Sequence, residues 1–70
     1  MMMFYSRGDE IEVVIDREGL GVDEGVGHLA DETMVVIVGA GGRIGQAVQA
    51  TVMAIQKTRL GPSLIANARL

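Results

Sequence analysis

The stretch VVIVGAGGRIGQAV (residues 35–48) decides the fold of this 70-residue chain. Four β-branched apolar residues lead into a loop with four glycines, and a second apolar stretch follows. A strand, a glycine loop and a helix in this order begin a dinucleotide-binding unit. Two strands joined by a glycine loop belong instead to a β-sheet. The fold class therefore depends on whether residues 46–58 are helical or extended.

The spacing of the glycines disfavours a nicotinamide cofactor. Gly39 and Gly41 fit the first two positions of the G-x-G-x-x-G fingerprint, but Ile44 stands where the third glycine allows close helix packing. About 20 residues further on, where an acidic residue would hold the ribose, the chain has Arg59. We therefore expect no cofactor, and we interpret residues 39–45 as a connection between two antiparallel strands.

Residues 46–58 fit both conformations. Val48, Val52 and Ile55 form a helical stripe, but the same two valines also share one face of an extended strand with Ala50. A 70-residue chain is too short for the several parallel strands and crossover helices of a dinucleotide-binding fold. The extended conformation is therefore the one that we predict.

Other segments show strand patterns. Residues 9–16 (DEIEVVID) alternate apolar and acidic side chains, and residues 63–69 alternate as well. Residues 33–38 are apolar on both faces, which favours a central, covered strand. With residues 26–29 and 46–58, the chain has about five short strands. The predicted core takes one face of each strand: Ile11, Val13, Ile15, Leu29, Met34, Val36, Val38, Ile44, Val48, Val52, and Leu64 or Ile65.

Charge divides the chain into two parts. The first 32 residues contain nine acids and two bases (−7), whereas the remainder contains four bases and no acid (+4). A surface needs only local positive charge to attract phosphate, so the net charge of −3 does not exclude nucleic acid. The split matters only if the fold gathers the four bases; otherwise they are solvated side chains. Those bases are Arg43, Lys57, Arg59 and Arg69.

Catalytic constellations and membrane segments are absent from the sequence. The chain has one histidine, His28, no cysteine, and no histidine near Ser6 or Ser63. We interpret the acids as solvent-facing charges. No segment approaches ~20 unbroken apolar residues, so we expect no membrane span. The start is too short for a signal peptide, and we expect a cytoplasmic protein without enzymatic activity.

The ordered pattern of short motifs resembles a family. The string GVGHLADETMVVIVGAGGRIGQAVQATV, with GDEIEVVI before it and QKTRLGPSLIANAR after it, is similar to a TRAM domain, most of all to those at the C-terminus of bacterial PIN–TRAM proteins. The match extends over residues 8–69. The residues that carry it are Gly25-Val26-Gly27-His28-Leu29, Asp31, Thr33-Met34-Val35-Val36, Ile44-Gly45, Thr58, Gly61, Ile65, Ala68 and Arg69.

This resemblance implies a small all-β, five-stranded antiparallel β-barrel of the OB-like type over residues 8–70, preceded by an N-terminal segment or linker remnant of residues 1–7. It also implies an accessory module that binds RNA, with a PIN nuclease domain on the parent chain as a partner. No nuclease residues are carried over, because that domain is not within this sequence. The bases expected to contact phosphate with little sequence preference are Arg43, Lys57, Arg59 and Arg69, with Arg17 and His28 as further candidates.

A different class of function remains open. Residues 33–38 are apolar on both faces, and a small barrel with open strand edges is suited to self-association or docking. The alternative is therefore a structural module, including a homo-oligomer, without nucleic-acid binding.

Overall fold

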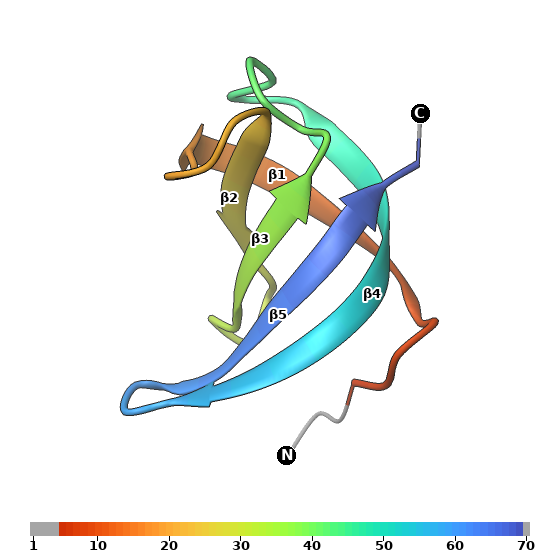
Figure 1. Cartoon of the computed structure of the whole chain (residues 1–70), viewed down its shortest axis with the longest axis vertical. Coiled ribbons are helices and arrows are strands. Elements are labelled where there is room, and N and C mark those ends of the chain that lie inside the picture. The colour runs from red at the N-terminus through yellow and green to blue at the C-terminus, as the bar shows by residue number, and fades with distance from the viewer. Residues whose placement is uncertain (1–4, 70) are drawn as a thin grey trace.

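The computed structural model describes residues 5–69, and every regular element in that range is a β-strand (Figure 1). The strands are β1 (Glu10–Glu18), β2 (Glu24–His28), β3 (Met34–Val38), β4 (Ala47–Thr58) and β5 (Gly61–Ala68). The stretch after the glycine loop is thus extended, as predicted, and it forms the longest strand. The turn between β4 and β5 is short, because β4 ends at Thr58 and β5 begins at Gly61.

The five strands close into a ring in the order β1-β2-β3-β5-β4, with β4 paired to β1. Four of the five pairs are antiparallel, but β3 and β5 are parallel, with Met34 opposite Ser63 and Val38 opposite Asn67. The predicted purely antiparallel arrangement is therefore wrong. Its physical reason is parity: neighbouring strands can alternate direction around a closed ring only when the number of strands is even.

The glycine loop does not connect paired strands. β3 pairs with β2 and β5, whereas β4 pairs with β1 and β5. The loop over residues 39–46 instead passes across one end of the ring from β3 to β4 (Figure 1). Our interpretation of the loop as a turn between two paired antiparallel strands is thus wrong. The hairpin partner of β4 is β5, which follows it directly in the chain.

The interior of the ring is lined by small and β-branched side chains. Of the predicted core, Val13, Ile15, Val48, Val52 and Leu64 are buried, and Ile11 and Leu29 pack against them while partly exposed. Ile65 is half-buried. The remaining members of the buried cluster were not predicted; they are Val35, Ile37, Ala40, Ala50 and Ala66.

The predicted face of β3 is the wrong one. Val35 and Ile37 are fully buried, whereas Met34 and Val36 are half-exposed and Val38 is 37% exposed. Side chains alternate along a strand, so a shift of one residue exchanges the inner and outer faces. Because residues 33–38 are apolar throughout, their pattern carried no information about which face is inside.

Ile44 was also predicted to be in the core, but it is 57% exposed. The β3–β4 loop instead inserts Ala40 into the interior, where it is fully buried. A Cβ added to Gly25 would lie 2.8 Å from the carbonyl oxygen of Ala40 and 2.9 Å from Cγ2 of Ile15. The space that Ala40 fills exists because β2 has no side chain at Gly25.

Candidate nucleic-acid interface

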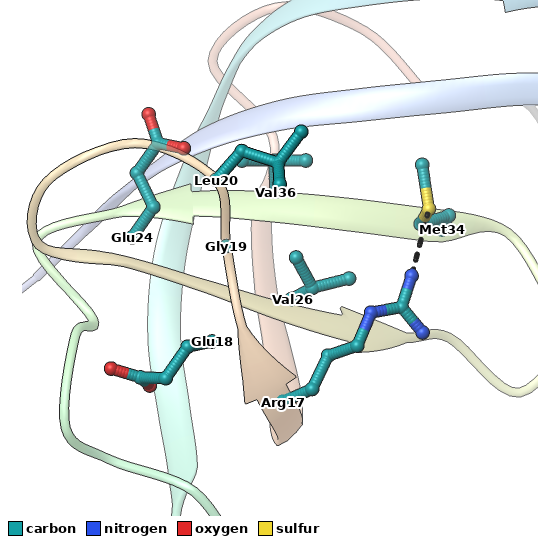
Figure 2. Close-up of a pocket in the computed structure, with 8 residues that line it drawn as sticks. All are labelled: Arg17, Glu18, Gly19, Leu20, Glu24, Val26, Met34 and Val36. Atoms are coloured by element: carbon teal, nitrogen blue, oxygen red, sulfur yellow. Dashed lines mark hydrogen bonds between the residues drawn. The ribbon is translucent and has the colours of Figure 1, made fainter.

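The outer surface of β2 and β3 carries apolar side chains. Val26 points outward, since Gly25 and Gly27 on either side of it face the interior, yet it is only 6% exposed. Val26 lies in a pocket on this surface, and the neighbouring side chains that line the pocket are shown in Figure 2. We call this surface the β2–β3 face; the pocket on it is lined by Arg17, Glu18, Gly19, Leu20, Glu24, Val26, Met34 and Val36.

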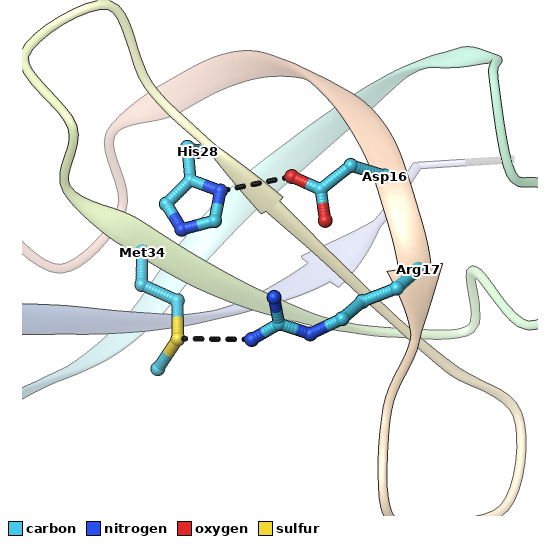
Figure 3. A network of polar contacts seen from close by, with 4 residues as sticks. All are labelled: Asp16, Arg17, His28 and Met34. Atoms are coloured by element: carbon cyan, nitrogen blue, oxygen red, sulfur yellow. Dashed lines mark hydrogen bonds and ion pairs between the residues drawn. The ribbon is translucent and has the colours of Figure 1, made fainter.

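Arg17 extends over the β2–β3 face. The strand β1 has a bulge between Ile15 and Arg17, after which Arg17 stands opposite Val26. Its Nη2 lies 3.9 Å from the sulfur of Met34 (Figure 3). Within residues 5–69 the two ion pairs join other residues, so no carboxylate pairs with the guanidinium of Arg17. The bulge therefore positions a cation above apolar side chains.

His28 lies beside Arg17 and forms a hydrogen bond with the carboxylate of Asp16. Its Nδ1 is 2.8 Å from Oδ2 of Asp16, the residue that precedes Arg17 in the bulge (Figure 3). Asp16 therefore accompanies His28 on this surface.

A second pocket joins the β2–β3 face to the hairpin of β4 and β5. Its lining includes His28 and Met34 from the face, and Thr58 and Leu60 from the hairpin. The hydroxyl of Thr58 donates to the carbonyl of Gly61 at 2.7 Å and accepts from the N–H of Leu60 at 3.2 Å. These bonds hold the turn that carries Leu60, which is fully exposed.

Two predicted bases, Arg17 and His28, line the pockets of this surface. Lys57 and Arg59 are the chain neighbours of Thr58, which lines the second pocket, and neither contributes to the lining. Acids lie along the same surface, since Glu18, Glu24 and Glu32 contribute to its pockets.

Arg43 and Arg69 lie at the end of the ring opposite the β4–β5 turn, which is the end that also holds the β1–β2 loop. Arg43 is in the β3–β4 loop, and Arg69 follows β5, whose Asn67 is opposite Val38. The β4–β5 turn lies beyond the first residue of β3 instead, because Met34 is opposite Ser63. Arg69 forms an ion pair with Glu10. The six predicted bases therefore do not form one patch.

Several acids that the sequence assigned to solvent accept hydrogen bonds from backbone N–H groups. Oδ1 of Asp23 accepts from Gly41 at 3.1 Å, and Oε1 of Glu24 accepts from Gly21 at 3.1 Å. Glu18 accepts from Gly42 with both oxygens, at 2.8 Å and 3.1 Å. The acidic β1–β2 loop is thus fastened to the glycine loop, a role that sequence spacing did not reveal because the partners are 18 to 24 positions apart.

Tyr5 contacts the turn between β2 and β3. The hydroxyl of Tyr5 donates to Oδ2 of Asp31 at 3.0 Å, and the N–H of Thr33 donates to Oδ1 at 3.1 Å. Hydrogen bonds from the side chain and backbone of Thr33 lower the pKa of Asp31. Partial burial and the contact with Asp31 raise the pKa of Tyr5.

Neither a metal site nor a membrane-spanning helix is found between residues 5 and 69. In three comparisons with known proteins, no family model, curated protein or solved structure matched this chain. The candidate interface therefore rests on the geometry of the chain itself.

Proposed function

We propose that this chain is an OB-like module of the TRAM type that binds RNA on the β2–β3 face. The observation that carries the proposal is Arg17, a guanidinium without a carboxylate partner among residues 5–69 that lies over the apolar side chains of Met34 and Val26. A cation beside an apolar surface suits a ligand that has both phosphates and bases.

The surroundings of Arg17 support this location. OB-folds bind oligonucleotides on the face of strands 2 and 3, between the loop joining strands 1 and 2 and the loop joining strands 4 and 5. Here the β1–β2 loop contributes Leu20 to one pocket of that face, and the β4–β5 turn contributes Leu60 to the other. Both leucines are fully exposed and stand at opposite ends of the proposed site.

The proposed mechanism is electrostatic capture. Arg17, Lys57 and Arg59 contact phosphates, and the bases lie against Met34 and the neighbouring aliphatic side chains. Among residues 5–69, no aromatic side chain lines either pocket of the face, and stacking on aromatic rings supplies ~1–3 kcal/mol per base in other single-strand binders. Binding therefore depends on charge, with little preference for sequence, as suits an accessory domain.

The test is a salt titration of an unstructured single-stranded RNA oligonucleotide, followed by fluorescence anisotropy. Three phosphate contacts predict that log K falls with log salt with a slope of about −2. Arg17→Gln should weaken binding about tenfold and bring the slope toward about −1.4. Arg69→Gln is the matched control, since it removes the same charge from a side chain that pairs with Glu10 and lines neither pocket of the β2–β3 face. No binding at low salt overturns the proposal, and a larger loss in Arg69→Gln than in Arg17→Gln places the interface elsewhere.

A docking or oligomerisation module is the second candidate function. It is favoured by the full exposure of Leu20 and Leu60, because large apolar side chains at loop tips often mark protein contacts. Light scattering separates the two functions. A stable oligomer that Leu60→Ser converts to a monomer, in a chain that does not bind RNA, favours docking.

A further inference from the structure

The β3–β4 loop donates two successive backbone N–H groups to acidic side chains. Gly39 and Gly42 have φ angles of +92° and +74°, a conformation that side chains disfavour. The N–H of Gly41 donates to Asp23, and the N–H of Gly42 donates to a separate carboxylate, that of Glu18. Successive N–H groups in such a turn make an anion-binding concavity, as in many phosphate sites.

An anion from the chain already occupies this concavity. Both carboxylate oxygens of Glu18 accept from the N–H of Gly42, at 2.8 Å and 3.1 Å. Figure 2 shows that the side chain of Glu18 points away from Arg17, its neighbour in β1. Glu18 and Gly42 are both exposed, so the position of this carboxylate is open to solvent.

A positively charged side chain follows the two glycines. The nearest polar partner of the Arg43 guanidinium is the neutral amide oxygen of Gln46, 3.4 Å from Nη1. Neither ion pair within residues 5–69 involves Arg43. An anion on the N–H of Gly42 therefore lies one residue from a cation that no carboxylate neutralises.

The loop keeps its conformation without Glu18. The N–H of Gly39 donates to the carbonyl of Asp23 at 2.8 Å, and the N–H of Gly45 donates to the carbonyl of Ile15 at 2.7 Å. Burial of Ala40 adds to this anchor, since its side chain is fully enclosed in the core. The donors of the concavity are therefore preorganised, and the cost of arranging them does not fall on a ligand.

We propose that the β3–β4 loop is a phosphate-binding cradle that Glu18 occupies as an intramolecular competitor. The ligand is a phosphate group, held by the N–H of Gly42 and by the guanidinium of Arg43. The phosphate comes either from free inorganic phosphate or from an RNA backbone, and the RNA source rests on the proposed function. A tethered carboxylate competes at an effective concentration of ~mM or above, so the native chain binds phosphate only weakly.

The experiment is a titration of the full chain with inorganic phosphate, followed through backbone amide resonances. Glu18→Ala should show saturable shifts of the Gly42 amide, with a Kd at least tenfold lower than that of the native chain. Glu18→Gln, which retains the shape of the side chain, should lie between the two. Adding Arg43→Gln to Glu18→Ala should raise the Kd again. Glu12→Gln is the matched control, because it removes an acid from the same strand whose partner is the distant Gln49.

The outcomes separate this proposal from the RNA-binding function. An unchanged Gly42 amide in folded Glu18→Ala overturns the cradle, as does equal phosphate affinity in Glu18→Ala and the native chain. Phosphate binding by Glu18→Ala in a chain that fails to bind RNA supports the cradle with a free anion as its ligand. If Glu18→Ala also binds the RNA oligonucleotide several-fold more tightly than Glu12→Gln does, the phosphate belongs to RNA.

Discussion

Replacing Gly27 by alanine should destabilise this protein, although strand sequences in general suggest the opposite. Gly27 lies within β2 and does not have a positive φ, so alanine fits its backbone conformation. Where there is room, such a change stabilises a protein by ~0.4–1 kcal/mol, because it restricts the unfolded chain. The sign of the effect therefore depends on the space around the added methyl group.

That space does not exist. A Cβ on Gly27 would lie 2.3 Å from the carbonyl oxygen of Val14 and 2.4 Å from Cγ1 of Val13. The first clash is with backbone, so β1 and β2 must separate at the point where they pair. Overpacking of this kind costs ~1–3 kcal/mol. With the unfolded-state gain subtracted, we expect a net loss of about 1.3 kcal/mol from a total of roughly 4–10 kcal/mol for a domain of this size.

The assay is thermal unfolding followed by circular dichroism. A loss of about 1.3 kcal/mol should lower the Tm by about 5–10 °C, since each kcal/mol shifts the Tm of a domain of this length by ~4–8 °C. Gly45→Ala separates the clash from backbone strain, because Gly45 has a φ of +86° and nothing within 4 Å of the added Cβ. It should cost ~1–2 kcal/mol. Val13→Ala should not rescue Gly27→Ala, since the carbonyl of Val14 remains.

A Gly27→Ala variant with an unchanged or higher Tm would refute this reasoning. It would mean that the inner face of β2 is not packed against β1 as described.

Two further predictions concern stability. Ile37→Ala should lower stability by ~2–5 kcal/mol in urea denaturation, whereas Val38→Ala should cost under 1 kcal/mol, because Ile37 is inside the ring and Val38 is outside; equal losses would contradict this assignment of the β3 faces. Since the pKa of Asp31 is lowered in the folded chain, its contribution to stability is present above its ordinary pKa of 3.8 and is lost as the pH falls through the folded value. Asp31→Asn should therefore flatten the acid limb of the urea midpoint against pH, and an unchanged limb would show that Asp31 does not contribute.

The candidate interface was only partly predictable. Arg17, His28, Lys57 and Arg59 were identified as candidates from charge, but nothing in the sequence separated them from Arg43 and Arg69. The grouping depends on which ends of the strands lie together, and the parallel pairing of β3 with β5 determines that. The outward position of Met34 and Val36 was missed because both were assigned to the core.

The function of the acidic loop was also outside the reach of sequence analysis. Glu18 and Asp23 read as solvated charges, whereas they bond to the N–H groups of Gly42 and Gly41. Glycine content identified a loop at residues 39–45 without indicating what its donors bind. The acceptors are the carboxylates of Glu18, at the end of β1, and Asp23, in the β1–β2 loop. The closed ring brings them to the same end as the glycine loop.

The sequence by itself determined where the chain is extended and where it turns, because these depend on local alternation, β-branching and glycine. Only the tertiary structure decided which face of β3 is inside, which strands are neighbours, and which charges share a surface. A strand that is apolar on both faces can place either face inside, and its pairing with neighbouring strands determines which one is buried. A closed ring of five strands also requires a parallel pair, which no local pattern specifies.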